Sequence, residues 1–270
     1  MDPLSHAAFG RMLAALDDRP RSGVTAAYVL GALCPDLDLA RAAQGWDVYL
    51  LSHQSGSHCV LGAIGCGLLT GSVVALFSRE RWRALVMAGT VGAASHVALD
   101  YVSGADLRLL APISDRVFTL PLFAMADPWL LCALCIGAAA AWIAGRRGAW
   151  AGVALVAALL SIKAGFYLRA GGIERAAVHA ATHVDAVFGS WTRWTFIDTL
   201  PAALERWDVD AWTRRAIRTA SIDRQLDTPP AVRSRALPTV SNLLASHGDT
   251  FARVVRRPDG GQDVRWSALR

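Results

Sequence analysis

The chain has 270 residues, of which 54% are hydrophobic and only 18% charged, and it carries a formal net charge of +5. An average soluble domain has about 25% charged residues. The composition therefore argues against an ordinary soluble protein and favours a small polytopic membrane protein with a polar appendage. Arginines beside membrane spans usually set topology and contact lipid headgroups, so we expect membrane lipids as partners and no nucleic acid.

The first predicted elements are two short helices. Asp2 or Ser5 can cap a helix that runs to about Leu16, where a charged segment with a proline ends it. A second apolar helix, Ser22 to Leu33, is shorter than the ~20 residues of a full bilayer crossing. We expect this second helix to be buried, re-entrant or interfacial.

Four longer apolar segments follow, each about the length of one crossing. The sequence thus predicts a mainly α fold, in which the first 170 residues form a polytopic helical membrane domain of about four spans. Short arginine-rich turns tend to stay in the cytoplasm, and such turns follow the first and third spans, so the opposite ends should be extracytoplasmic. The predicted spans are Cys59–Phe77, Ala84–Val102, Pro128–Ala144 and Ala149–Leu168.

The last hundred residues differ in character, because charged residues and tryptophans recur and no span fits. Thr192–Ile197 and Phe251–Val255 alternate like strands. Asp259-Gly260-Gly261 is typical of a hairpin turn. We predict a small carboxy-terminal α+β domain over residues 171–270, on the extracytoplasmic side.

Imidazoles and carboxylates gather at the ends of the apolar segments, where they are costly unless they pair, face water or bind a metal. The strongest pair is His96 and Asp100, one helical turn apart. Both can bind one ion, or Asp100 can orient the imidazole. The alternative is a His–Asp hydrogen bond that only stabilises helix packing.

Three other segments offer the same residue types. The Gly/Ser-rich segment from His53 to His58 can direct two imidazoles to one point, Asp36 and Asp38 follow a helix end, and His6 lies near the start. Each alone is explained as well by a solvated loop, a helix-ending turn or an incidental histidine. Mixed His and Asp ligation suits zinc, manganese or iron. Taken together, the segments predict a cluster for more than one divalent ion, with the ligands His6, Asp36, His53, His58, His96 and Asp100.

Such a cluster indicates phosphoester hydrolysis, because two metals about 3.5–4 Å apart can bridge a water, lower its pKa and hold the oxygens of an in-line displacement. Asp38 or Asp115 is expected to act as the base for a metal-activated water. Arg108 and Arg116 lie in the loop beside the cluster, and we expect them to hold the anionic headgroup of a lipid phosphoester. The alternatives are a structural metal in a non-catalytic membrane protein and a metal or proton carrier, although a carrier should have polar residues in mid-span.

These motifs, in this order and together with Pro112–Arg116, resemble the YdjM-like family of inner-membrane, metal-dependent hydrolases, some of them LexA-regulated. The closing Val264–Arg270 resembles the end of longer members, which extends the resemblance over nearly the whole chain. The family is distantly similar to zinc-dependent phospholipase C, an all-helical fold with a His/Asp metal cluster. The resemblance implies a multi-pass protein of the bacterial inner membrane that acts as a hydrolase, with zinc as the first choice of metal.

One departure from the family pattern concerns the paired histidines. The family has His-Arg-Gly-x-Thr-His where this chain has His53-Gln54-Ser55-Gly56-Ser57-His58, so the imidazole spacing is kept and an arginine becomes Gln54. A cation that can hold a phosphate is lost, and Arg108 or Arg116 could replace it.

Two further groups are expected to lie outside the chemistry. His179, His183 and Asp185 have ligand spacing on a predicted helix but fall outside the family motifs. Lys163 lies within the fourth predicted span, where we expect it to snorkel or to pair with a carboxylate.

Overall fold

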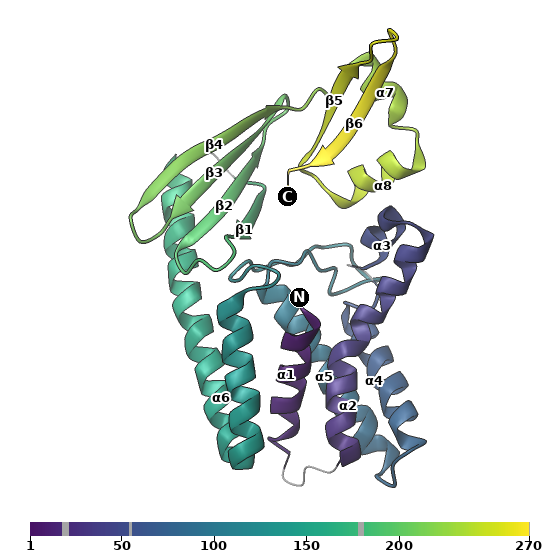
Figure 1. The fold of residues 1–270 in the computed structure, drawn as a ribbon, viewed down its shortest axis with the longest axis vertical. Coiled ribbons are helices and arrows are strands. Elements are labelled where there is room, and N and C mark those ends of the chain that lie inside the picture. Colours follow the sequence, from purple (N-terminus) through teal and green to yellow (C-terminus); the bar gives the residue numbers. More distant parts are fainter. Residues whose placement is uncertain (18–21, 54–55, 178–180, 270) are drawn as a thin grey trace. The chain divides into compact units, whose positions relative to one another are not determined.

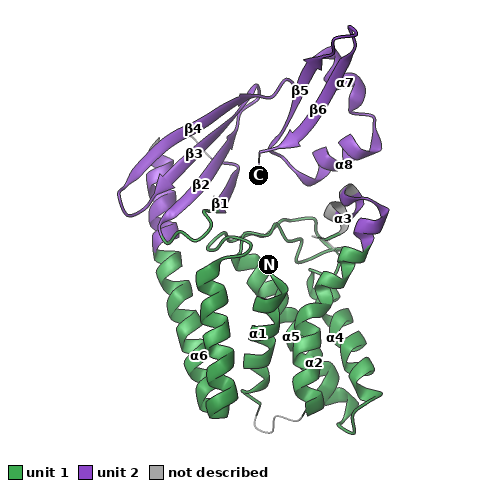
Figure 2. Cartoon of the chain, in the orientation of Figure 1, with its two compact units in different colours: residues 1–40, 52–165, 186–191 green, residues 41–51, 166–185, 192–270 purple. Residues whose placement is uncertain are grey.

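The computed structural model describes residues 1–17, 22–53, 56–177 and 181–269. The chain divides into two compact units (Figure 2). Unit 1 comprises Met1–Ala40, Ser52–Gly165 and Ala186–Trp191, and unit 2 comprises Arg41–Leu51, Phe166–Asp185 and Thr192–Arg270.

Unit 1 begins with α1 (Pro3–Ala14), which Asp2 caps as expected. The Asp2 side chain accepts hydrogen bonds from the backbone N–H of Ser5 at 2.9 Å and from its hydroxyl at 2.7 Å. A side-chain oxygen at this position satisfies one of the free N–H groups of the first turn. The cap therefore fixes where α1 starts, one turn before His6.

The second helix has the predicted bounds, but a further helical element follows it directly. α2 (Ser22–Leu33) runs directly into the 3-10 helix η1 (Cys34–Gln44), and together they form an apolar helical segment of 23 residues, long enough to cross a bilayer. Pro35 suggested a break, but proline is tolerated in the first turn of a new helical segment, where its missing N–H has no intrahelical partner. α2 alone is therefore too short for a crossing, as predicted, and it is the continuation by η1 that makes the segment a candidate span.

The next helices of unit 1, α4 (Val60–Ala75) and α5 (Trp82–Val102), pack through glycines. A Cβ built on Gly71 would lie 2.6 Å from the Cα of Val86, so the two helix backbones touch there. On the other side of α5, a Cβ on Gly31 of α2 would lie 2.8 Å from the Cα of Gly89. Glycine thus allows α5 to contact both neighbours at backbone distance, as small residues do in membrane bundles.

The longest helical element, α6 (Pro128–Ala177), is broken at Gly145, whose φ of 55° and ψ of −132° are not helical. Its two arms lie side by side (Figure 1), and a Cβ on Gly152 would lie 2.6 Å from the Cα of Gly137. A positive φ costs glycine little, which explains why the turn falls there. The predicted break between Ala144 and Ala149 is confirmed in position.

The number of membrane spans differs from the prediction. Among the described residues, three helical segments are long and apolar enough to cross a membrane: Ser22–Gln44, Trp82–Val102 and Pro128–Ala176. α4 has only 16 residues and counts as a shorter apolar helix. The expected set of about four spans is not shown, because α4 is shorter than predicted and the third and fourth predicted spans both fall within the broken element α6.

Unit 2 is rich in β-structure, as the alternating segments predicted. Its four-stranded sheet has the order β1-β2-β3-β4, with β2 to β4 antiparallel, and a separate hairpin pairs β5 with β6. The predicted hairpin turn is confirmed at Gly260, with φ of 84°. The elements are α3 (Trp46–His53), β1 (His183–Ala186), β2 (Arg193–Thr199), β3 (Ala203–Asp210), β4 (Arg215–Asp223), α7 (Pro229–Ser234), α8 (Pro238–Ser246), β5 (Thr250–Arg256) and β6 (Gln262–Ala268).

Candidate metal centre

Four ligand atoms from three separate segments converge at one end of the helices of unit 1. The Nε2 atoms of His58 and His96 lie 3.0 Å apart. Each lies 3.3 Å from Oδ2 of Asp100. Oδ1 of Asp36 lies 3.6 Å from the first imidazole and 3.4 Å from the second. We call these four residues the tetrad.

The spacing of the tetrad matches the coordination shell of a small divalent ion. Zinc binds imidazole nitrogen and carboxylate oxygen at about 2.0–2.2 Å. In a tetrahedral shell, ligand atoms at that radius are about 3.3–3.5 Å from one another. The distances between the tetrad atoms scatter around this value, so the residues present fit a metal at the centre of the group.

The orientation of His96 is fixed by the backbone of α2. Its Nδ1 lies 2.7 Å from the carbonyl oxygen of Ala32 and donates its proton there. This hydrogen bond leaves the lone pair on Nε2, which faces the tetrad. His96 is therefore held in the tautomer and direction that metal binding requires.

His58 is oriented by an analogous chain of hydrogen bonds. The hydroxyl of Ser57 donates to Oδ2 of Asp38 at 2.7 Å and lies 3.0 Å from Nδ1 of His58. Because the hydroxyl proton is used on Asp38, the hydroxyl oxygen can accept the Nδ1–H of His58. His53 adds to this chain, since its Nδ1 lies 3.0 Å from both oxygens of Asp38.

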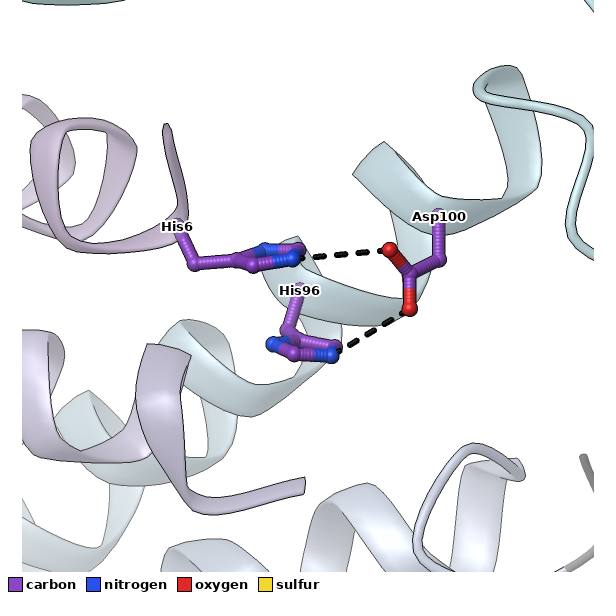
Figure 3. Close-up of side chains that lie close together, drawn as sticks. All are labelled: His6, His96 and Asp100. Atoms are coloured by element: carbon purple, nitrogen blue, oxygen red, sulfur yellow. Dashed lines mark ion pairs between the residues drawn. The ribbon is translucent and has the colours of Figure 1, made fainter. Parts of the chain in front are cut away.

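His6 completes a second group with His96 and Asp100 (Figure 3). Its ring stacks on that of His96, with centroids 3.6 Å apart, and its Nε2 lies 3.4 Å from Oδ1 of Asp100. His6 is fully buried, and apart from this long contact with Asp100 its ring nitrogens have no hydrogen-bond partner among the described residues. Buried polar atoms are rarely left unpaired, so this imidazole is suited to bind a cation. Oδ1 of Asp100 also accepts a hydrogen bond from the amino group of Met1, with N and O 2.6 Å apart.

Within the described part of the chain, two groups could hold a metal: His6, His96 and Asp100, and Asp36, His53 and His58. All six residues predicted as ligands therefore come together in unit 1, although they span residues 6 to 100. The cluster is closed on most sides, since the side chains of His6, His58 and His96 are 0% exposed. Its open side is formed by Asp36, 27% exposed, and His53, 20% exposed.

Burial and charge act differently on two histidines that lie outside the candidate spans. Burial lowers the pKa of His6, which keeps its imidazole neutral. Burial also opposes protonation of His58, but its contacts with Asp100 and Asp36 outweigh this and raise the pKa of His58.

The predicted base Asp115 and the predicted headgroup residues Arg108 and Arg116 have contacts of their own and belong to neither metal-binding group. Asp115 is 91% exposed and forms an ion pair with Arg108 at 3.7 Å. The guanidinium of Arg116 lies over the ring of Phe118 at 5.1 Å. Neither metal-binding group includes Asp115, whereas Asp38 contacts two of the histidines. Gln54 lies outside the described residues.

The structure corrects one expectation each for His183 and Lys163. His183 lies in strand β1, and its Nε2 is 3.0 Å from Oδ1 of Asp185, so the helix predicted there is wrong; His179 lies outside the described residues. Lys163 is buried and donates to the carbonyl oxygen of Ser190 at 2.8 Å, so it does not snorkel to the surface.

Two contributors to the cluster were not singled out from the sequence. The carbonyl of Ala32 carries no sequence signal at all, since every residue has one. Ser57 could have been found, because it precedes His58 and a hydroxyl commonly supports a ligand.

Comparison with known families supports the resemblance seen in the motifs. A family model described as YdjM inner membrane protein matches residues 1–171, which include every residue of the tetrad and leave most of unit 2 unmatched. The comparisons with curated proteins and with solved structures give no match. With the matched family and several candidate spans, the chain belongs to the YdjM family of inner membrane proteins.

Proposed function

We propose that this protein is a membrane-bound, metal-dependent hydrolase that cleaves a phosphoester, with zinc as the first candidate metal and room for more than one ion. The observation that carries the proposal is the convergence of the tetrad atoms at 3.0–3.6 Å on a point with one open side. A catalytic metal site keeps an open coordination position for water or substrate, whereas the coordination shell of a structural site is closed.

In this proposal six residues bind the metal and one carboxylate acts as the general base. His6, Asp36, His53, His58, His96 and Asp100 hold the metal, which supplies Lewis acidity and lowers the pKa of a bound water. Asp38 contacts His53 and Ser57, and it is the carboxylate placed to accept a proton at the cluster. Because Asp115 is exposed and paired with Arg108, Asp38 is the preferred base.

The substrate is proposed to be a lipid phosphoester approached from the extracytoplasmic side. The arginine-rich turns follow the opposite ends of the helices from the cluster: Arg79, Arg81 and Arg83 lie between α4 and α5, while His58 precedes α4 and His96 lies in the last turns of α5. Arginines favour the cytoplasmic end. The cluster then lies near the outer leaflet, where lipid phosphates are found.

A second candidate function is a structural metal site in a non-catalytic membrane protein. It is favoured by the ligand count, because the tetrad alone supplies the four ligands of a closed structural zinc site. In that case the metal would stabilise the packing of α2, α4 and α5, and it would have no free coordination position for a water.

The experiment that separates the two candidates measures metal content and hydrolysis together. Purified full-length protein in detergent is analysed for bound metal and assayed on phosphodiesters with a chromogenic leaving group. The hydrolase proposal expects bound divalent metal and turnover, both lost in His96→Ala and retained in His183→Ala. Stoichiometric metal with no turnover on any phosphoester, and a lower melting temperature without metal, would instead support the structural site.

A further inference from the structure

An apolar groove lies between α4 and α5, on a face of α5 adjacent to that of the candidate metal centre. Its volume is about 390 Å³, within the range of small-molecule sites. Its wall carries only two hydroxyl-bearing side chains. The lining residues are Cys59, Val60, Ala63, Ile64, Thr90, Ala94, Val97, Ala98, Tyr101 and Leu109.

The groove lies beside the backbone contact of α4 with α5 at Thr90, on the side of this contact that faces Tyr101. A Cβ on Gly67 would lie 2.5 Å from the Cα of Thr90, so the backbones are in contact there. From Thr90 towards Tyr101 the face of α5 carries the small, exposed residues Ala94 and Ala98. These leave a space that larger side chains would fill, so the groove is closed at Thr90 and open along its side.

The other end of the groove reaches the candidate metal centre. Cys59, Val97 and Tyr101 line the groove, and each directly follows a tetrad residue in the chain, namely His58, His96 and Asp100. Leu109 closes this end, since its carbonyl accepts the backbone N–H of Val60 at 3.0 Å. The groove therefore ends next to His58, which precedes α4, and next to His96 and Asp100 of α5.

The length of the groove suits one leaflet of a membrane. From Thr90 to Tyr101, α5 rises about 16 Å at 1.5 Å per residue. Half of a bilayer's hydrocarbon core is about 15 Å. A groove that starts near mid-membrane and ends at a polar cluster matches the two parts of a lipid. Its apolar length can contact the hydrocarbon chain, and the cluster can contact the phosphate.

We propose that this groove binds one hydrocarbon chain of the lipid whose phosphoester lies at the candidate metal centre. The inference rests on the proposed function, because it assigns the chain of that same substrate. A groove with almost no polar lining gains affinity with each methylene that it removes from water. It also fixes the distance of the phosphoester from the closed end at Thr90.

A labelling experiment tests the groove without relying on turnover. The full-length protein in nanodiscs is incubated with a phosphatidylglycerol that carries a diazirine near the end of one acyl chain, and the cross-linked peptides are mapped. We expect labelling at Ala63, Ile64 and Ala94, and at least a tenfold loss of it in Ala98→Trp, which fills the groove. The matched control is Ala139→Trp, since Ala139 is an exposed alanine of α6 that does not line the groove.

Zinc binding by each variant checks that the variant folds. If the tryptophan of Ala98→Trp abolishes zinc binding, Ala94→Phe is used in its place. Label spread evenly over α5 and α6, or label unchanged in both groove variants, would overturn the groove as a chain site. This result would leave the hydrolase proposal intact, because it does not depend on the acyl chain.

A kinetic experiment tests whether the groove binds the hydrocarbon chain of the substrate. In the unmodified protein, shortening the acyl chains of a phospholipid substrate from sixteen to six carbons should raise KM by about tenfold or more, since each methylene contributes to binding. Ala98→Trp should remove this dependence, whereas the control Ala139→Trp should keep both the dependence and the kcat of the unmodified protein. The same chain-length dependence in Ala98→Trp would mean that the groove holds a bystander lipid, and would overturn the proposal.

Discussion

His96 and Ala32 are 64 residues apart in the chain, yet Nδ1 of His96 lies 2.7 Å from the carbonyl oxygen of Ala32. Asp36 of the tetrad follows Ala32 by one helical turn. The packing of α2 on α5 therefore sets both the tautomer of one ligand and the position of another. This packing depends on glycines, because Gly31 meets the backbone of Gly89 and Gly92 meets the backbone of α2 at Tyr28.

A glycine far from any ligand atom should therefore control metal binding. In Gly31→Val the side chain would collide with the backbone of Gly89, where a Cβ already lies 2.8 Å from its Cα. Overpacking of this kind typically costs about 1–3 kcal/mol, and the displaced α2 should carry Asp36 and Ala32 away from His96. We expect weaker zinc binding, measured by equilibrium dialysis, together with a lower melting temperature in detergent.

The matched control is Gly165→Val, because nothing lies within 4 Å of a Cβ built on Gly165. It should change neither zinc affinity nor melting temperature appreciably. If Gly31→Val binds zinc as tightly as the unmodified protein, helix packing does not set the geometry of the cluster.

Ser57 offers a test of the hydrogen-bond chain behind His58. Ser57→Ala removes the hydroxyl between His58 and Asp38, which should lower zinc affinity by about 10- to 100-fold, as loss of a ligand's supporting partner commonly does. Ser57→Thr keeps the hydroxyl and should retain most of the affinity. Competition with a chromophoric chelator measures all three proteins, and equal affinities for the alanine and threonine variants would contradict the role given to the hydroxyl.

The sequence predicted the members of the cluster better than its surroundings. His96 and Asp100 could be paired because helical spacing places i and i+4 on one face. Asp36, His53 and His58 could be added because the order of motifs resembles a known family. Helix packing brings these segments together, and that packing is a long-range property that residue patterns carry only indirectly.

Where the prediction failed, a local signal was overridden. α2 ends at Leu33, as Pro35 predicts, but the 3-10 helix that continues the segment to Gln44 was not expected. The spacing of His183 suggested a helix, whereas its strand pairs within a sheet whose partners lie farther along the chain.

Zinc binding should weaken as the pH falls, for a reason visible at His58. Its pKa is raised by contacts with Asp100 and Asp36 despite burial, so in the metal-free protein a proton competes for the imidazole to a higher pH than usual. Metal needs the neutral ring. Apparent affinity should thus fall as the pH is lowered through that raised pKa and level off above it.

Competition titrations between about pH 8 and pH 6 measure this dependence, which spans the usual histidine range. Calorimetry in two buffers of different ionisation enthalpy should show that zinc uptake releases protons. Affinity that stays constant or rises on acidification would contradict proton competition at the cluster.

His6 distinguishes a metal ligand from a histidine that is merely buried. In the metal-free protein its Nδ1 is buried without a hydrogen-bond partner among the described residues, and its Nε2 has only the 3.4 Å contact with Asp100. A buried polar atom left unpaired costs about 1–3 kcal/mol. His6→Phe keeps a ring stacked on His96 and removes both nitrogens. The variant should therefore melt at the same or a higher temperature than the unmodified protein when both are stripped of metal. With zinc added, the unmodified protein should gain stability by mass action, and His6→Phe should gain clearly less. An equal zinc-dependent rise in melting temperature for the two proteins would show that His6 packs against the cluster without binding its metal.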